Sequence, residues 1–291
     1  MNNIQFVLNT DKIIYKNIGD YDLEQTFECG QAFRFDRCAD GYTGFVEKQL
    51  CYITLQDEKG QNVPSVCGME NASMTVKLYG TQPTEEFALA AGRFLALDTD
   101  YAALKKQFAQ NEVMARAIEF APGIRVLNQD FFETLITFII SQNNNIPRIK
   151  QLCDRISEGY GTKVGDRYAF PTAQQMKDIT EQDYRDMKFG FRAKYLADAV
   201  AKVLEGTISE GTVKSLPYEE AQKYLMQIKG VGPKVADCVL LFSCRQYRSF
   251  PKDVWIKKAM AQLFPNGIPK EIEGWEGIAQ QYIFHYARHT L

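Results

Sequence analysis

Several features that this 291-residue chain lacks narrow its class before any motif is considered. No uninterrupted apolar run approaches the roughly 18 residues that a membrane-spanning helix needs, so the sequence predicts no membrane insertion. The amino terminus lacks the basic and then apolar pattern of a signal peptide. Because 45% of the residues are hydrophobic, the chain can build a globular core. We therefore expect an intracellular, soluble protein, long enough for two domains.

Signals for disulfides and for metal sites are also missing. The seven cysteines form no C-x-x-C pair, which favours reduced thiols over a disulfide framework. The two histidines, His285 and His289, would share one face of a helix, but the H-E-x-x-H signature of zinc enzymes is absent. We expect a surface pair at these positions, no bound metal and no cofactor.

The charge is distributed unevenly although the net charge is only −2. Residues 1–120 hold 11 basic and 17 acidic side chains, whereas residues 121–291 hold 23 basic and 19 acidic ones. A polyanion such as a nucleic acid would therefore bind to the second part of the chain.

The spacing of apolar residues changes along the chain and predicts an α+β fold. Alternating segments in the first part indicate strands, which we expect at Gln31–Phe35, Tyr42–Val46, Leu50–Leu55 and Thr75–Tyr79, with one helix at Pro83–Leu97. Helical spacing begins near Phe131, and the expected helices are Phe131–Ser141, Pro147–Gly159, Ala173–Ile179, Glu181–Met187, Arg192–Leu204, Tyr218–Ile228, Pro233–Phe242, Val254–Phe264 and Glu273–Thr290. The prediction is an antiparallel sheet domain over residues 1–120 and an all-α domain over residues 121–291.

A short turn between two of these helices has the composition of a phosphate-binding hairpin. Gly230 would end the first helix, and Pro233 would open the second at its first position. Glycines at 230 and 232 permit positive φ and carry no Cβ, so the backbone N–H groups that follow could approach a phosphate oxygen. A helix-hairpin-helix element holds the DNA backbone in this way without reading bases. An ordinary helical hairpin with a glycine C-cap would give the same pattern.

Two ionisable residues after the hairpin could carry chemistry. Lys234 falls in the first helical turn, where the positive end of the helix dipole disfavours an ammonium ion and favours a nucleophilic amine. Such an amine could attack a sugar C1′ and expel a base, although Lys234 could equally be a second phosphate contact or a solvated charge. Asp253 precedes an apolar helix as an N-cap would. In the catalytic interpretation its carboxylate faces Lys234 and stabilises an oxocarbenium-like sugar.

These segments carry a family likeness. Gly230–Cys238 and Pro251–Val254 resemble the hairpin, lysine and aspartate of the 8-oxoguanine DNA glycosylases, which belong to the helix-hairpin-helix glycosylase superfamily. Further segments match in the same order through both halves of the chain, namely Cys29–Phe35, Leu95–Asp98, Val126–Asp130, Ile140–Arg148 and Gly190–Tyr195. Branches of the superfamily with an iron–sulfur cluster carry four cysteines after the aspartate, and this sequence has none beyond Cys244.

The resemblance implies a set of residues that recognise the damaged base. The carbonyl of Gly30 would accept the proton on N7 of the oxidised base, a proton that guanine lacks. Cys238 and Phe284 would stack on either side of the flipped base, and Gln280 would contact its pairing edge. Without the family, Cys238 and Phe284 would be read as core residues.

The resemblance also implies contacts with the rest of the duplex. Asn143, the first of three consecutive amides that would otherwise be read as a turn, would enter the space left by the damaged base. Arg148 and Arg192 would approach the orphaned partner base. Phe191 stands where many members have tyrosine, so we expect a looser preference for the partner base. Trp255 stands where many members have a histidine near phosphate.

The implied function is a bifunctional DNA repair enzyme that excises 8-oxoguanine from duplex DNA, preferably opposite cytosine. Lys234 would form a Schiff base, and β-elimination would nick the strand. We expect a monomer, in the cytoplasm with the nucleoid of a bacterium or in the nucleus of a eukaryote. Two alternatives are a monofunctional glycosylase for alkylated bases, which lacks a lysine at this position, and a non-catalytic DNA-binding module. Lys234 together with Asp253 distinguishes among these readings.

Overall fold

The computed structural model describes residues 3–291, and packing divides the chain into two compact units. The sheet unit comprises the chain up to Asn128 together with Lys252–Leu291. The hairpin unit is Gln129–Pro251.

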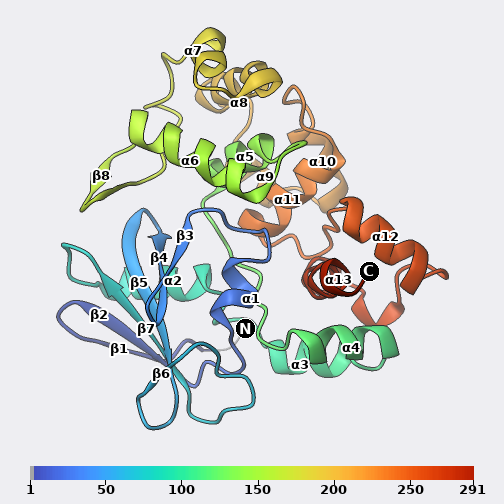
Figure 1. Ribbon diagram of the computed structural model, residues 1–291. Coiled ribbons are helices and arrows are strands. Elements are labelled where there is room, and N and C mark those ends of the chain that lie inside the picture. Colours follow the sequence, from blue (N-terminus) through green and yellow to red (C-terminus); the bar gives the residue numbers. More distant parts are fainter. Residues whose placement is uncertain (1–2) are drawn as a thin grey trace. The chain divides into compact units, whose positions relative to one another are not determined.

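The sheet unit contains an antiparallel sheet and several helices, and the last segment of the chain contributes some of these helices (Figure 1). Its strands are β1 (Phe6–Leu8), β2 (Lys12–Lys16), β3 (Phe35–Cys38), β4 (Gly41–Val46), β5 (Gln49–Gln56), β6 (Asn62–Val63) and β7 (Ser73–Leu78). Its helices are α1 (Leu23–Phe27), α2 (Glu85–Phe94), α3 (Tyr101–Phe108), α4 (Glu112–Phe120), α12 (Val254–Leu263), the 3₁₀ turn η2 (Lys270–Ile272) and α13 (Glu276–Thr290).

The sheet follows the order β1-β2-β7-β5-β4-β3, with β6 paired to β5. Ile13, Val76 and Ile53 lie opposite one another on β2, β7 and β5, and all three are fully buried. Each such side chain contributes about 1.5–3 kcal/mol when it leaves water. Tyr15 lies two residues after Ile13, on the same face of β2, and its hydroxyl donates to the Ala88 carbonyl of α2 at 2.6 Å, which fixes α2 to the sheet.

Contacts near the carboxyl end differ from the predicted domain division at residue 120. The carbonyl of Glu271 accepts a bond from the Gln107 side chain of α3 at 2.8 Å. Phe120 at the end of α4 packs edge-on against Tyr286 of α13, with ring centroids 5.7 Å apart. Because these contacts join α13 and its approach to α3 and α4, Lys252–Leu291 packs as part of the sheet unit rather than with the helices that precede it.

The hairpin unit is built almost entirely of helices (Figure 1). They are α5 (Phe131–Ile140), α6 (Ile146–Tyr160), α7 (Glu181–Asp186), the 3₁₀ turn η1 (Gly190–Arg192), α8 (Ala193–Leu204), α9 (Glu210–Ser215), α10 (Tyr218–Leu225) and α11 (Pro233–Cys244), with a small hairpin of β8 (Lys163–Val164) and β9 (Arg167–Tyr168). The centre of the unit is α11, in which every residue from Val235 to Cys244 is buried. It packs against α5, and Phe138 stacks on Phe242 with centroids 5.4 Å apart.

The predicted α+β class is confirmed, and most predicted helices are present with ends that shift by up to three residues. Two predictions are wrong. Ala173–Ile179 forms successive turns instead of a helix, since most of its backbone hydrogen bonds join residues three apart, such as the Lys177 N–H to the Gln174 carbonyl. The strand predicted at Gln31–Phe35 begins only at Phe35, the first residue of β3, and residues 31–34 are irregular, with the Gln31 side chain bonding the carbonyls of Thr26 and Arg125 instead of a strand ladder. The sequence did not indicate the strands β1, β2, β6, β8 and β9 or the helices α1, α3, α4 and α9.

The lengths and compositions of these helices also bear on whether any of them could span a membrane. None of the helices formed by residues 3–291 combines the length and the apolar composition needed to cross a bilayer.

A buried arginine links distant segments of the sheet unit. Arg125 is 4% exposed and donates to the carbonyls of Ile18 at 3.0 Å and Asp20 at 2.9 Å. Its guanidinium lies 4.2 Å from the centroid of the Tyr101 ring. The carbonyl of Arg125 accepts the Gln31 amide at 2.7 Å. This one residue therefore fixes the exit of β2, the start of α3 and the segment around Gln31.

We expect Arg125→Met to destabilise the sheet unit. Two carbonyls would lose their donor, at about 1–3 kcal/mol for each acceptor left buried and unpaired. Thermal unfolding should show a melting temperature several degrees lower. Arg37→Met is the control, because the Arg37–Glu24 ion pair is well exposed and exposed pairs contribute little. An equal response of the two variants would contradict the assignment of Arg125 as a structural link.

Candidate DNA-binding and catalytic residues

The turn between α10 and α11 has the predicted hairpin form, with one difference between its glycines. Gly230 has φ of +77°, and a Cβ placed there would lie 2.4 Å from the ring of Tyr195 on α8. Gly230 is therefore required both by conformation and by space. Gly232 has φ of −99° and open space around its missing Cβ, so the expected positive φ is absent there.

The start of α11 is open to an anion. Gly232 is the N-cap of α11 and has no side chain that could accept hydrogen bonds from the N–H groups at the start of this helix. Pro233, at the next position, has no N–H. The free N–H groups of the first turn, together with the positive end of the helix dipole, favour a phosphate oxygen. Open space at Gly232 leaves room for its approach.

Two carboxylates hold the hairpin in place. Asp198 of α8 accepts the Lys229 N–H at 2.8 Å and the Lys202 ammonium at 2.9 Å. Burial of Asp198 opposes its ionisation, but these bonds hold its pKa below the usual value. Asp237 of α11, 6% exposed, accepts the Tyr218 hydroxyl at 2.9 Å and the Gln222 amide at 2.6 Å, which ties α11 to α10. Partly buried polar contacts therefore hold the two hairpin helices and the turn between them together.

Lys234 lies half-buried in the first turn of α11, as predicted, and its ammonium faces an aromatic ring. The Nζ atom is 5.3 Å from the centroid of Phe138 on α5. Cys238 follows one turn later on α11 and is 2% exposed. Both residues thus lie on the helix that starts at the turn predicted to bind phosphate.

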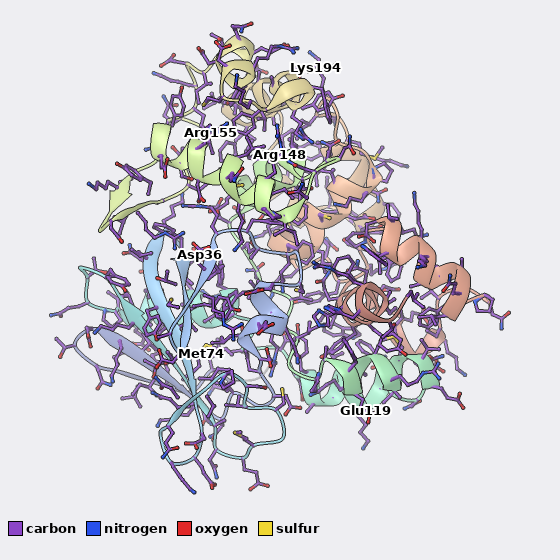
Figure 2. All side chains as sticks on the ribbon, in the orientation of Figure 1. Asp36, Met74, Glu119, Arg148, Arg155 and Lys194 are labelled. Atoms are coloured by element: carbon purple, nitrogen blue, oxygen red, sulfur yellow. The ribbon has the colours of Figure 1, made fainter. Side chains whose placement is uncertain are left out.

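Four residues predicted to contact the duplex converge in the hairpin unit. Asn143 has φ of +48° in the turn between α5 and α6, and its carbonyl accepts Nη2 of Arg192 at 2.8 Å. The Arg192 guanidinium lies 4.5 Å from the centroid of Phe191, whose side chain is 44% exposed. Arg148 on α6, labelled in Figure 2, donates to the Lys188 carbonyl at 3.2 Å.

Arg192 has a structural role that the sequence did not indicate. It is 5% exposed, and the carbonyls of Gln142 and Phe189 also accept its N–H groups. Burial, together with the neighbouring charge of Arg148, lowers the pKa of Arg192. In this structure the guanidinium holds the turn that presents Asn143, and like charges of two arginines lie close together beside it.

The predicted base-recognition residues of the sheet unit also lie together. Gly30 has φ of +84°, and a Cβ there would lie 3.9 Å from the Phe284 ring of α13. Gln280 lies one turn before Phe284 and is 3% exposed. Gln31 fixes the neighbouring backbone, since its amide oxygen accepts the Leu127 N–H at 2.8 Å. The structure thus brings Gly30, Phe284 and Gln280 to one place on the sheet unit.

Asp253 is an N-cap, as its position in the sequence indicates. Its Oδ1 accepts the Ile256 N–H at 2.7 Å at the start of α12. The next residue, Val254, is 79% exposed, and the Trp255 ring lies 5.5 Å from the Lys258 ammonium. Asp253 belongs to the sheet unit and Lys234 to the hairpin unit, so their predicted pairing stays a prediction.

The two histidines form a pair on α13, in which His289 is exposed, as expected, and His285 is half-buried. Their ring centroids are 4.5 Å apart, and both rings lie near Phe120. Burial lowers the pKa of His285 to about 4, with help from His289 and Arg288. Among residues 3–291, no three His, Cys, Asp or Glu side chains gather as a metal site would require.

Comparison with known proteins covers nearly the whole chain. The model of the 8-oxoguanine DNA glycosylase N-terminal domain matches residues 13–135, and that of the HhH-GPD superfamily of base excision DNA repair proteins matches residues 136–273. An N-glycosylase/DNA lyase of Saccharomyces cerevisiae is 31% identical over 269 residues, which cover 83% of this chain and 68% of that protein. The chain belongs to the 8-oxoguanine DNA glycosylase family.

Solved structures agree with this family. The 8-oxoguanine glycosylase/lyase of Clostridium acetobutylicum, in complex with double-stranded DNA containing cytosine opposite 8-oxoG, is 34% identical and has a TM-score of 0.85, with 99% of each chain covered. An N-glycosylase/DNA lyase of Arabidopsis thaliana is 32% identical over 249 residues, or 80% of this chain, and the chain spans 64% of its length.

Sequence reasoning missed some residues that shape the glycosylase site. Tyr195 and Asp237 lie inside the matched motifs, so their place was visible but their contacts were not. Nothing in the sequence marked Phe138 as a site residue, because it is one of many apolar residues in a helix that was predicted to belong to the core. Its contact with Lys234 depends on how α5 packs on α11.

The two hairpin glycines should respond differently to alanine. Gly230→Ala meets both an unfavourable φ and the Tyr195 ring, so it should lower the melting temperature and weaken duplex binding. Gly232→Ala has an ordinary φ and free space, so it should fold normally and weaken only binding. Thermal unfolding and duplex titration of both variants provide the measurement. Equal melting temperatures would show that the turn does not need glycine at 230.

Proposed function

We propose that this chain is a bifunctional DNA glycosylase and AP lyase that removes 8-oxoguanine from duplex DNA. The observation that carries this proposal is a lysine in the first turn of the second hairpin helix, within a chain whose two halves match the family in order. The DNA substrate implies that the enzyme acts inside the cell, where the chromosome lies. We propose that it works as a monomer.

Lys234 is the nucleophile in this proposal. Its neutral Nζ forms a bond to the sugar C1′ while the bond from C1′ to the base breaks, and the electron pair leaves with the base. Loss of a proton and opening of the sugar ring convert the adduct into a Schiff base. Removal of a proton from C2′ then expels the 3′ phosphate, which nicks the strand. The base must be flipped out of the duplex for C1′ to be reached.

Asp253 stabilises the positive charge that develops on the sugar as the base departs. The Gly30 carbonyl accepts the N7 proton of the oxidised base and meets a lone pair in guanine, so discrimination comes from one buried hydrogen bond. Cys238 and Phe284 stack on the flipped base, and Gln280 bonds its pairing edge. The proximity of Gly30, Phe284 and Gln280 within the sheet unit supports this assignment.

Partner-base recognition is proposed for the cluster beside Asn143. Asn143 fills the gap left by the flipped base, and Arg148 and Arg192 donate to the O2 and N3 acceptors of cytosine. The nearby like charges of the two arginines favour a group rich in acceptors. Cytosine is therefore the preferred partner, and the missing hydroxyl of Phe191 makes the preference looser than in members with tyrosine. Gly230 and Gly232 present the turn to the phosphate backbone.

Lys234→Gln should abolish base excision and covalent trapping while duplex binding is kept. The test is incubation with a duplex that contains 8-oxoguanine opposite cytosine, with borohydride added to reduce any imine. Wild type should release the base, nick the strand and form a trapped complex. Excision without trapping in wild type would instead indicate a monofunctional glycosylase, and binding without excision a non-catalytic module.

Asp253→Asn should separate the capping role of Asp253 from its proposed electrostatic role. Asparagine is an equally good N-cap, so the melting temperature should stay the same. Single-turnover excision should fall by about 10²-fold or more if the negative charge stabilises the transition state. Asp253→Ala is the companion variant, which also loses the cap, at about 1 kcal/mol. Full activity of Asp253→Asn would leave only the cap.

A further inference from the structure

The segment after α7 places a lysine in a conformation that favours glycine. Lys188 is exposed and has φ of +71°. Helix α7 ends here in a Schellman motif, in which the Phe189 N–H donates to the Tyr184 carbonyl at 3.0 Å. The second bond of the motif runs from the Lys188 N–H to the Arg185 carbonyl at 2.9 Å. Glycine is the usual residue at the position of Lys188, because a Cβ in the left-handed region costs folding free energy.

The turn itself does not depend on the lysine side chain. Its hydrogen bonds are made by the backbone, and the rings of Phe189 and Tyr184 pack edge-on, with centroids 5.8 Å apart, as is typical of the motif. A cation near the end of a helix is favoured by the helix dipole, but Arg185 already supplies one in the last turn of α7. Glycine or asparagine at position 188 would therefore end α7 at least as well, and folding does not explain the lysine.

Two arginines of α6 contact the backbone of this segment. Arg155 donates from Nη1 to the Met187 carbonyl at 2.5 Å. Arg148 donates from Nη2 to the Lys188 carbonyl at 3.2 Å. Both arginines are exposed, and both are labelled in Figure 2. The guanidinium of Arg148 therefore lies beside the backbone from which the Lys188 side chain extends.

The surroundings of Lys188 are rich in positive charge. Burial, and next the charge of Arg148, lower the pKa of Arg192, so these two cations lie close together. Asp183 and Asp186, the carboxylates of α7 nearest to Lys188 in the sequence, accept hydrogen bonds within α7 and its cap. In the part of the chain that the structure describes, no carboxylate pairs with the Lys188 ammonium. A group of cations of this kind attracts an anion.

We propose that Lys188 is a DNA-binding residue whose ammonium contacts a backbone phosphate of the strand that carries the partner base. The inference rests on the proposed function, in which Arg148 donates to that base. Because Arg148 lies against the Lys188 backbone, the phosphates next to the partner base fall within reach of the flexible four-carbon lysine side chain. The contact positions the duplex and carries no sequence information. The unfavourable φ of Lys188 is kept for binding and not for folding.

Binding to a duplex with tetrahydrofuran, an abasic-site analogue that cannot be cleaved, opposite cytosine tests the contact apart from catalysis. Lys188→Gly and Lys188→Asn remove the charge and suit the left-handed backbone, whereas Lys188→Arg keeps the charge. Loss of one phosphate contact should lower the slope of log affinity against log salt concentration by about 0.9, so binding weakens about eightfold at ~0.1 M salt and about fourfold at ~0.2 M. Lys188→Arg should bind within about twofold of wild type.

Thermal unfolding of the same variants separates binding from structure. The melting temperatures of Lys188→Gly and Lys188→Asn should equal or exceed that of wild type, because glycine and asparagine tolerate the left-handed conformation better than lysine. A lower melting temperature of both variants would show that the lysine serves folding. That result, or an unchanged salt slope, overturns the proposal.

Arg185→Gln is the matched control, since it removes one positive charge three residues earlier in the same segment. The Arg185 guanidinium bonds Glu181 at 2.6 Å, so its charge is already paired. Its salt slope should stay within about 0.2 of the wild-type slope. A drop as large as that of the Lys188 variants would show that only net charge matters, and would reject a specific contact.

Neutral phosphates assign the contact to a strand. Methylphosphonate replaces one phosphate at a time, beside the cytosine on one strand or beside the abasic analogue on the other. Wild type should lose affinity at a phosphate beside the cytosine, and Lys188→Asn should lose no further affinity at that same phosphate. Losses that simply add at every phosphate beside the cytosine, or coupling confined to the damaged strand, overturn the proposal.

Failure of the underlying function has a different signature. If wild type does not excise 8-oxoguanine, the proposed enzyme activity is rejected, and the phosphate contact is still decided by the salt slope and the methylphosphonate coupling. If wild type excises the base and Lys188→Asn keeps the wild-type salt slope, only the role of Lys188 is rejected.

Discussion

The hairpin unit depends on one close approach, that of the backbone at residue 230 to the ring of Tyr195. Any Cβ at this position would lie 2.4 Å from the ring, so only glycine allows the turn to rest on α8. That contact fixes where α11 begins, and with it the open N–H groups and Lys234. The same helix α8 follows directly from η1, which contains Phe191 and Arg192. The turn proposed to bind phosphate and the cluster proposed to read the partner base therefore both depend on α8 and the 3₁₀ turn that leads into it.

The sheet unit uses a buried polar network for a similar purpose. Gln31 bonds the carbonyls of Thr26 and Arg125 and accepts the Leu127 N–H, so a segment without regular structure has nearly fixed backbone positions. Gly30 directly precedes it. Recognition of one proton on a base requires a carbonyl that cannot turn away, because a mobile acceptor would lose little when that proton is missing. Under the proposed function, the network explains how an irregular segment can hold the Gly30 carbonyl in a fixed position.

The sequence predicted features that depend on neighbours along the chain. Pro233 and Gly230 marked the hairpin, and Asp253 marked the start of α12, because caps and turns are local. The alternation of polar and apolar residues wrongly indicated that a strand begins at Gln31. A side chain that takes the place of the strand's hydrogen bonds leaves the same alternating pattern in the sequence. The contact of Phe138 with Lys234 and the bonds of Arg192 to the Asn143 turn require the packing of separate helices. No spacing within the sequence encodes them.

The hydrogen bonds of Arg192 affect how Arg148 and Arg192 share the recognition of the partner base under the proposed function. Its N–H groups are directed at the carbonyls of Gln142, Asn143 and Phe189, so a bond to a partner base must compete with contacts that hold the Asn143 turn. Arg148 is exposed and makes a 3.2 Å bond to the Lys188 carbonyl, which water or a base can replace at little cost. Under the proposed function both arginines donate to the partner base, and Arg192 must give up a bond to the Asn143 turn to do so, whereas Arg148 gives up only the bond to the Lys188 carbonyl.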